Sequence, residues 1–409
     1  MRVSLKFTGN WNQEIGLQDY MAGTSEHPTQ SVPPFFASKA MNLPPDSARL
    51  VLSCVLRQPG IAQPAIARET GLAQQSVSRI VKVLVQLGAL IPVERSSHGR
   101  RGQPGMAVRI ATKFAYTFGV SMMTDAISVA LMDFSGEVLE QVYLEQPAMT
   151  RALVIDKLQS TFANLMANSG VKRKDVLGVG VGISGYCLDG KSRFNTPRQL
   201  DEWALVDIDS LLSEELDFPV WVENDGNAAA IGESLYGVGR VYSNFVYMYI
   251  AVGIGGGVVL NRELWRGANG NGGELGLILP SHVYPHPTIE LLRQTIARAG
   301  VEVGSISKML SDFDPSWPGI DEWIAKTSES FSIISSAIAA LLDVQAIVLG
   351  GRMPESLAKK VIPHIEIFDD ARRAEPRPTP RIFGSEVQGD ASAIGAAALP
   401  FKKYFFSSQ

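Results

Sequence analysis

The sequence predicts an α/β protein made of two related halves around a cleft, with a small winged helix-turn-helix domain ahead of them. Two patterns carry this prediction. Apolar residues recur at helical spacing between residues 46 and 87, whereas from Phe114 onward short buried strands alternate with amphipathic helices. At 409 residues, with 45% of them hydrophobic, the chain exceeds what one core fills and suffices for two or three domains.

The N-terminal part of the chain contains the elements of the small domain in order. Residues 1–44 combine Pro33-Pro34 and Pro44-Pro45 with little periodicity, so we expect a poorly ordered arm. The winged helix-turn-helix is predicted over 45–112. Its helices are expected from Asp46, over 63–69 and over 74–87, with a glycine turn at Gly71 and two strands over 89–93 and 106–110 that flank a loop.

Positive charge is concentrated in this domain. Residues 47–110 contain nine Lys or Arg against two Glu, although the whole chain has a formal net charge of −4. Such asymmetry, a polar outer helix face and an arginine-bearing wing together indicate binding to double-stranded DNA, although an ordinary solvated face is the alternative. The predicted DNA contacts are Gln74, Gln75, Ser76, Ser78, Arg79 and Lys82 on the third helix and Arg95, Arg100 and Arg101 on the wing.

The rest of the chain has α/β texture. A strand, a Ser-Gly turn and a returning strand are expected over 129–138, a helix over 153–167, and a buried strand over 176–183 that ends at Ser184-Gly185. The same kinds of element follow: strands over 245–259, helices around 289–299 and 331–342, and a strand over 346–351 that ends in glycine. Two α/β halves of this kind are expected to enclose a cleft.

Two further features of the sequence indicate in which cellular compartment the protein works. Cys54 and Cys187 are far apart in apolar surroundings, which argues against a disulfide framework and for a reducing compartment. No stretch of eighteen apolar residues occurs. We therefore expect a cytoplasmic protein with no membrane partner.

Four motifs together resemble the ROK family, whose name joins repressor, open reading frame and kinase. They are Glu223-Asn224-Asp225-Gly226-Asn227-Ala228, Gly253 to Gly257, Gly272-Gly273-Glu274-Leu275-Gly276 and Ile347 to Gly351. The resemblance implies an actin-like, ribonuclease-H-like pair of subdomains with a sugar in the cleft, the first over 113–240 completed by 390–409 and the second over 241–389. It also implies a winged helix-turn-helix in repressor members.

The resemblance assigns sugar-binding roles to individual residues. It places Asp225 at the general base of the family's kinases and Asn224 at a ligand of neighbouring hydroxyl groups, which suits a carboxylate and a carboxamide on one turn. Glu274 and Glu290 match glutamates near the sugar. His282 is a candidate to replace a missing family histidine. A helix N-cap is the structural alternative for Asn224 and Asp225.

Three departures from the kinase pattern distinguish this chain. The Asp-x-Gly-Gly-Thr phosphate turn is replaced by Ser121-Met122-Met123-Thr124-Asp125, and we expect the Asp125 carboxylate to repel a polyphosphate. The second turn, Gly-Thr-Gly in kinases, reads Ala251-Val252-Gly253, without the hydroxyl donor. Leu277 replaces the zinc-motif histidine and no cysteine follows, so no zinc is expected. Prolines around His282 and His286 make a metal site there a weak alternative.

These observations predict a sugar-responsive, DNA-binding transcriptional regulator without enzymatic activity, metal or cofactor. We expect a repressor of carbohydrate uptake or catabolism genes whose effector is a monosaccharide or a phosphorylated or amino derivative. Reading two half-sites of an operator requires a homodimer or homotetramer. The alternatives are an active ATP-dependent hexose kinase with a DNA-binding arm, and a regulator whose cavity no longer binds a ligand.

Overall fold

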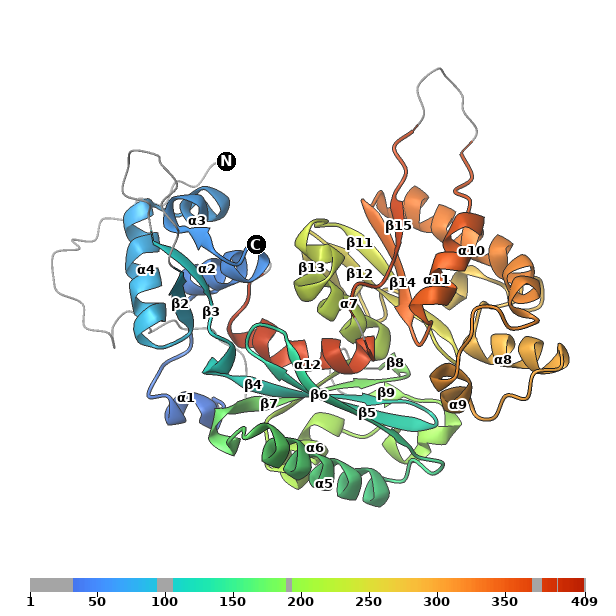
Figure 1. Ribbon diagram of the computed structural model, residues 1–409, viewed down its shortest axis with the longest axis horizontal. Coiled ribbons are helices and arrows are strands. Elements are labelled where there is room, and N and C mark those ends of the chain that lie inside the picture. Colours follow the sequence, from blue (N-terminus) through green and yellow to red (C-terminus); the bar gives the residue numbers. More distant parts are fainter. Residues whose placement is uncertain (1–31, 94–105, 189–192, 370–376, 388, 408–409) are drawn as a thin grey trace.

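The computed structural model describes residues 32–93, 106–188, 193–369, 377–387 and 389–407. Figure 1 shows a small N-terminal domain beside two α/β subdomains, each built on a five-stranded sheet. The predicted fold class, a winged helix ahead of two α/β subdomains, is confirmed. Within the described ranges, none of the helices combines the length and hydrophobicity that a membrane span requires.

The N-terminal domain is a winged helix-turn-helix. It contains α2 (Asp46–Arg57), α3 (Gln63–Thr70) and α4 (Gln74–Gln86), with a sheet in the order β1 (Ile61–Ala62), β3 (Ala107–Ile110), β2 (Leu90–Val93). Gly71 ends α3 with a φ of +70°, which is why the tight turn between the helices needs glycine. The predicted wing contacts Arg95, Arg100 and Arg101 lie outside the described residues.

The prediction of a poorly ordered arm over 1–44 is wrong for its described residues, 32–44. There α1 (Pro34–Ser38) is a short helix whose Phe35 and Phe36 side chains are 2% and 1% exposed. Their rings lie 6.2 and 5.6 Å, centroid to centroid, from that of Phe405. Burial of an aromatic ring contributes about 1.5–3 kcal/mol, so aromatic packing holds a segment too short to show helical periodicity.

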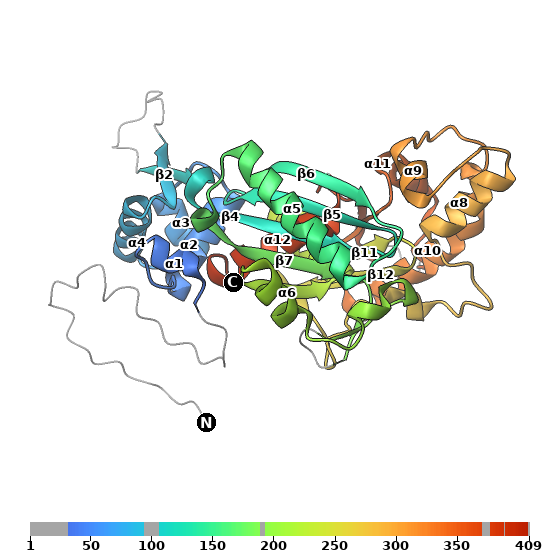
Figure 2. The ribbon, with the colours of Figure 1, turned by 90° about the horizontal axis from the view of Figure 1, so that it is seen from below.

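The first subdomain is a mixed sheet covered on both faces. Its strands run in the order β10 (Val220–Asn224), β7 (Val176–Ile183), β4 (Tyr116–Met122), β5 (Ala126–Asp133), β6 (Val138–Glu145). Helices α5 (Arg151–Ser169) and α6 (Ile208–Leu216) cover one face and α12 (Ala391–Tyr404) the other, as Figure 2 shows. A small hairpin of β8 (Tyr186–Cys187) and β9 (Phe194–Asn195) follows β7.

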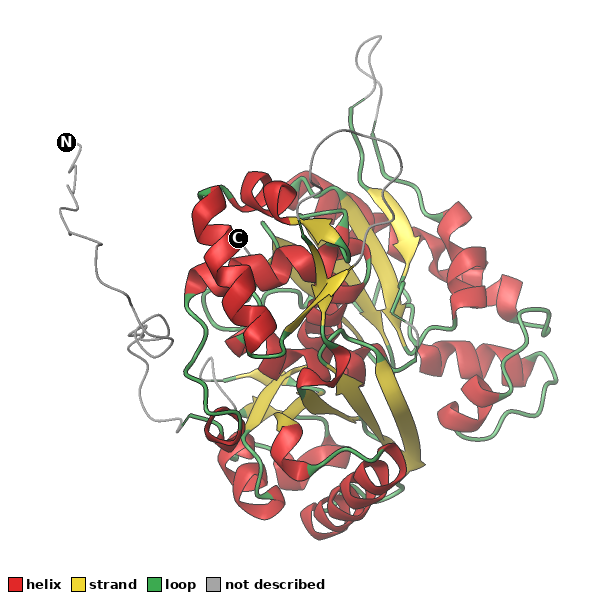
Figure 3. Ribbon diagram, turned by 60° about the vertical axis from the view of Figure 1, so that its left-hand side comes forward, coloured by secondary structure: helices red, strands yellow, loops and turns green. Residues whose placement is uncertain are grey.

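The second subdomain repeats this plan. Its strands run in the order β13 (Glu263–Trp265), β12 (Ile254–Leu260), β11 (Phe245–Ile250), β14 (Ala346–Gly351), β15 (Arg381–Gly384). Alternate residues of β11 face α7 (Asp225–Tyr236) on one side and α8 (Ile289–Arg298), α10 (Ile320–Leu342) and α11 (Glu355–Val361) on the other. Figure 3 shows helices, in red, packed against the yellow strands of the sheets. The remaining short elements are α9 (Ile306–Ser311) and the 3-10 turns Thr112–Phe114, Arg173–Asp175, Arg198–Trp203, Val238–Arg240, Leu275–Ile278 and Ile362–His364.

Helices α7 and α12 pack against each other between the two sheets, and glycine makes this close packing possible. A methyl group on Gly180 of β7 would lie 1.8 Å from the carbonyl oxygen of Ala396 in α12. One on Gly395 would lie 1.8 Å from the carbonyl oxygen of Ala228 in α7. Gly180 and Gly395 therefore allow α12 to approach both β7 and α7 closely.

The winged helix shares a hydrophobic core with the first subdomain. Aromatic residues from the end of α12 enter the same cluster as residues of α2 and α4. The Arg49 guanidinium of α2 donates to the carbonyl oxygens of Lys402 and Phe406 at 3.1 and 2.9 Å, and Ser407 N–H donates to Ser53 Oγ at 2.7 Å. The C-terminus thus ties the small domain to the body. Cys54 and Cys187 are both buried, and neither forms a disulfide bond with a described residue.

Candidate functional site

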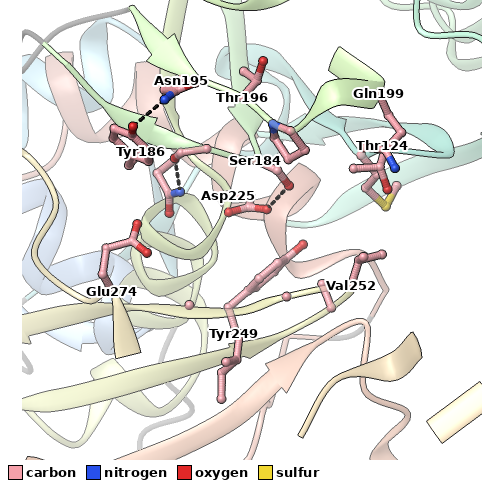
Figure 4. Close-up of a pocket in the computed structure, with 18 of the residues that line it drawn as sticks. Thr124, Ser184, Tyr186, Asn195, Thr196, Gln199, Asp225, Tyr249, Val252 and Glu274 are labelled. Atoms are coloured by element: carbon pink, nitrogen blue, oxygen red, sulfur yellow. Dashed lines mark hydrogen bonds between the residues drawn. The ribbon is translucent and has the colours of Figure 1, made fainter. Parts of the chain in front are cut away.

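A cavity of about 560 Å³ lies between the two sheets, at the carboxyl ends of their parallel strands. Ligands of α/β proteins bind at such ends. Its lining comes from both subdomains: Met123, Thr124, Ser184, Gly185, Tyr186, Asn195, Thr196, Pro197, Gln199, Asn224 and Asp225 from the first, and Tyr249, Ala251, Val252, Gly253, Ile254, Gly255, Glu274 and Arg352 from the second. Figure 4 shows Asp225 and Glu274 among the side chains that line this space.

Asn224 organises the turn that presents the neighbouring carboxylate. Its Oδ1 accepts hydrogen bonds from the backbone N–H groups of Gly226 (2.9 Å) and Asn227 (3.1 Å), and its Nδ2 donates to Gly185 O at 2.9 Å. Asn224 therefore does cap α7, the structural alternative that the sequence allowed. One hydrogen of its amide remains for a ligand.

Asp225 is the first residue of α7 and faces the cavity. Its Oδ2 accepts a hydrogen bond from Ser184 Oγ and its Oδ1 one from the Gly226 N–H at 2.8 Å. Burial nevertheless raises the pKa of Asp225 above its usual value, since desolvation outweighs these hydrogen bonds. Burial also raises the pKa of Glu274, and the nearby Asp225 charge raises it further. The cavity thus holds two carboxyl groups in a partly dry environment.

The structure brings together three of the five predicted sugar ligands. Asn224, Asp225 and Glu274 line the cavity, whereas Glu290 and His282 do not. Glu290 is instead held by Arg293, with two contacts of 2.8 Å that lower its pKa, and His282 is exposed. Glu290 pairs with Arg293 three residues later on its own helix, and His282 lies in an exposed segment after the 3-10 turn Leu275–Ile278.

The Asp125 turn is filled by an ion pair that joins the two subdomains. Arg352, directly after β14, is 6% exposed and its Nη1 lies 2.9 Å from Asp125 Oδ1. Its Nη2 donates to Tyr143 Oη at 2.8 Å and to Ser307 Oγ at 3.1 Å. We call Arg352, Asp125, Tyr143 and Ser307 the clasp. The expected repulsion of a polyphosphate relied on the charge of Asp125; in the structure this carboxylate is paired with Arg352, and the clasp side chains occupy the space beside it.

Two more polar contacts join the subdomains near the cavity. The amide of Asn271, from the second subdomain, accepts from Cys187 N–H at 2.7 Å and donates to Cys187 O at 2.8 Å. Arg266 contacts the buried carboxylate of Glu223 at 2.7 Å. Together with the clasp they hold the two halves in one closed arrangement around the cavity.

Several cavity residues were missed by the sequence analysis. Tyr186 and Asn195, which are hydrogen-bonded to each other, come from the β8–β9 hairpin, and Gln199 from the turn after it. Short hairpins of this kind give no periodic signal. Arg352 could have been found, because a charged residue directly follows the predicted buried strand that ends in Gly350-Gly351. Among the described residues no group of three His, Cys, Asp or Glu is placed to hold a metal ion.

The second candidate site is the outer face of α4. All six predicted contacts on this helix, Gln74, Gln75, Ser76, Ser78, Arg79 and Lys82, are exposed, whereas Val77, Ile80, Val81 and Leu84 are buried. The helix therefore presents an unbroken polar face beside the β2–β3 wing. Such a face fits a DNA major groove.

The comparisons with known families follow the two parts of the fold. Residues 117–288 match the ROK family, and residues 43–102 match the MarR family. The chain carries a ROK family domain. This ROK domain contains the cavity with Asp225 and Glu274, and the MarR-type winged helix ahead of it contains α4.

The curated proteins that this chain is similar to include regulators. The uncharacterized protein y4fQ of Sinorhizobium fredii is 25% identical over 360 residues, 88% of this chain and 91% of that protein. The xylose repressor of Bacillus spizizenii is 31% identical over 234 residues, 56% of this chain and 59% of the repressor. NagC of Escherichia coli, a DNA-binding transcriptional dual regulator, is 24% identical over 372 residues, 83% of this chain and 88% of NagC.

Solved structures share the fold. A ROK family transcriptional regulator, homolog of the Escherichia coli MLC protein, has a TM-score of 0.62 at 19% identity, covering 88% of this chain and 96% of that one. A ROK glucokinase from Streptomyces griseus, in complex with glucose and AMPPNP, has a TM-score of 0.56 at 21% identity, covering 70% of this chain and 99% of the kinase. Regulators and kinases thus share this fold, and the chemistry of the site must distinguish them.

Proposed function

We propose that this chain is a sugar-responsive repressor of genes for carbohydrate uptake or catabolism, and that it transfers no phosphate. One observation carries the proposal: a single chain joins an exposed polar recognition helix to a cavity that offers Asp225 and Glu274 to sugar hydroxyl groups. The matches to the xylose repressor, of which the chain spans 59%, and to NagC support the same function.

In the proposed mechanism, the sugar sets the angle between the subdomains. The cavity is lined from both, so a ligand that contacts both favours one closure angle. Helix α12 begins at Asp390, which caps it, and ends in the core shared with the winged helix. A change in closure therefore moves the winged helix. In a homodimer or homotetramer this changes the spacing of two α4 helices relative to two operator half-sites.

The absence of kinase activity is proposed because the usual phosphate contacts are missing. Met123 and Thr124 line the space after β4, the clasp fills the turn beyond them, and Val252 supplies no hydroxyl donor. The alternative, an active hexose kinase, is favoured by one observation, namely that Asp225 faces the cavity as a general base must.

An ADP assay separates these two functions. Protein incubated with Mg-ATP and glucose, mannose, N-acetylglucosamine or xylose is expected to form no more ADP than its Asp225→Ala variant does. Sugar-dependent ADP formation that the Asp225→Ala variant lacks would establish a kinase instead.

A DNA-binding assay tests the regulatory function. DNA fragments that the full chain selects from a random pool are titrated by fluorescence anisotropy with and without each sugar. At least one sugar is expected to change the dissociation constant about 5- to 150-fold. The Arg79→Ala variant is expected to lose a similar factor, about 1–3 kcal/mol, whereas the matched variant Gln86→Ala, exposed at the far end of α4, changes little.

Two outcomes would contradict the proposal. Equal DNA affinity with and without every sugar would remove the coupling. If calorimetry then also showed no sugar binding, the chain would be a ligand-independent regulator, the third possibility that the sequence left open.

A further inference from the structure

The described lining of the sugar cavity is rich in carboxylate and poor in positive charge. Asp225 and Glu274 both face it, and no described Lys or Arg forms an ion pair with either. Among the described lining residues, Arg352 is the one cation. Whether an anionic ligand can bind therefore depends on whether Arg352 is available to it.

Arg352 is already engaged on several sides. Its guanidinium, in a side chain 6% exposed, donates three hydrogen bonds within the clasp, to Asp125, Tyr143 and Ser307. Arg352 also lies close enough to the buried Asp390 to oppose the rise in pKa that burial causes there. Two carboxyl groups thus already compensate one guanidinium.

A phosphate ester fits this environment poorly. It carries a charge of about −1.5 to −2 at pH 7 and would meet Asp225 and Glu274 in a partly dry space. To gain Arg352 it would have to compete with Asp125, which is 30% exposed, for a guanidinium in a side chain only 6% exposed, at the cost of weakening that ion pair. Neutral hydroxyl groups face no such cost, because the two carboxylates accept their hydrogen bonds and the amides of Asn195 and Gln199 both donate and accept.

We infer that this cavity selects a sugar that bears no phosphate, and that the clasp is the element that enforces the selection. The inference rests on the proposed function and narrows it: the effector is the free monosaccharide, as it stands before any phosphoryl transfer consumes it. A sugar kinase reaction, carried out by another protein, would therefore convert this effector into a phosphate ester that the cavity does not bind.

Calorimetry on the full chain tests the inference with matched pairs. The probes are D-glucose, D-mannose, D-ribose, D-glucosamine and N-acetyl-D-glucosamine, each against its own terminal phosphate ester. At least one parent sugar is expected to bind, and its ester to bind at least tenfold more weakly. An ester that binds as tightly as its parent, or more tightly, would overturn the inference and leave the proposed repressor intact. Binding by neither set would overturn the proposed function and the inference with it.

A variant tests the role of the clasp. Asp125→Asn keeps the shape of the side chain and frees the charge of Arg352, so affinity for the phosphate esters is expected to rise at least tenfold. The control is Asp312→Asn, which removes a surface carboxylate of the second subdomain, paired with Lys308, and is expected to leave ester binding unchanged. Thermal melting checks that the Asp125→Asn protein is folded. If its affinity for the phosphate esters then equals that of the wild type, the clasp does not select against phosphate. If this variant does not fold, the paired-ligand result on the wild type decides.

Discussion

At the scale of single residues, Asp225 shows how a binding site opposes stability. A carboxylate that faced water would be solvated at no cost, whereas this one is partly dry and its pKa is raised by burial. Hydrogen bonds from Ser184 and Gly226 offset only part of that cost. The buried carboxylate of Asp225 therefore lowers the stability of the ligand-free protein and contributes favourably only when a ligand binds to it.

The Asp225→Asn variant is expected to melt at a higher temperature than the wild type at pH 7, without ligand. Below the usual pKa of an aspartate both folded and unfolded chains carry the proton, so burial costs nothing. As the pH rises through the raised folded pKa of Asp225, the unfolded state has already lost the proton and folding must bury a charge. The stability gap between variant and wild type should therefore open as the pH rises and close toward pH 4.

Thermal melts between pH 4 and pH 8 check this expectation. Asp312→Asn is the control, because contact with Lys308 lowers the pKa of Asp312 and predicts no such gain for its variant. An Asp225→Asn protein that melts below the wild type at pH 7 would show that its hydrogen bonds outweigh desolvation.

At the scale of secondary-structure elements, the contact of β7 with α12 fixes how closely helix and sheet approach. Gly180 and its neighbour on β4, Gly119, leave no room for a side chain, and Thr117 Oγ1 donates to Ala397 O across the same contact at 2.7 Å. Glycine here is required by close packing and by no unusual backbone angle.

Gly180→Ala is expected to destabilise the protein by about 1–3 kcal/mol or more, because the new methyl group would overlap the Ala396 carbonyl of α12 and force helix and sheet apart. Urea unfolding measures the change. In the matched variant Gly304→Ala, the added methyl makes only ordinary contacts of 3.5 Å with Lys308, and stability should shift by less than about 0.5 kcal/mol. Equal stabilities of the two variants would contradict this account.

The elements differ in how well the sequence predicts them, for physical reasons. The amphipathic α4 and the buried β7 have strong periodic or apolar patterns, and the structure places them at Gln74–Gln86 and Val176–Ile183. The five-residue α1 has no period to read and depends on aromatic contacts with the distant Phe405. Pattern alone also could not separate glycines that approach phosphates from glycines that approach helices.

Site residues follow the same distinction. Asn224, Asp225 and Glu274 lie in motifs whose neighbours in sequence are also neighbours in space, and all three reach the cavity. Glu290 and His282 were assigned from the family resemblance alone; in the structure Glu290 is bound by Arg293 and His282 is exposed. The pairing of Arg352 with Asp125 joins positions 227 residues apart and required the three-dimensional structure.

At the scale of the whole molecule, the winged helix and the first subdomain form one continuous core. Phe405 lies at its centre, 5.0 Å from the ring of Phe134 and 5.7 Å from that of Phe114. Helix α12 therefore joins the cavity side of the ROK domain directly to the DNA-binding domain. The proposed mechanism requires that a change at one end of this helix reaches the other.

Phe405→Ala is expected to lower the free energy of unfolding by about 3–5 kcal/mol and to weaken the packing of the winged helix against the first subdomain. Limited proteolysis should then release the N-terminal domain faster, and a sugar should no longer change DNA affinity although calorimetry still detects its binding. Phe405→Leu provides a milder change if the alanine variant does not fold. The control is Phe368→Ala, since that ring is 60% exposed. If a sugar changed the DNA affinity of a stable Phe405 variant as much as that of the wild type, coupling through this aromatic core would be excluded.

The shared aromatic core also limits how this chain can be re-engineered. A chimera that grafts only the winged helix onto another effector domain would expose Phe35, Phe36 and Phe114 to solvent. Such an exposed apolar patch promotes aggregation. A workable transplant must include the last turn of α12 and the residues after it, which pack against the winged helix although they lie far from it in the sequence. Specificity for a new operator is thus easier to obtain by rewriting the face of α4 than by exchanging modules.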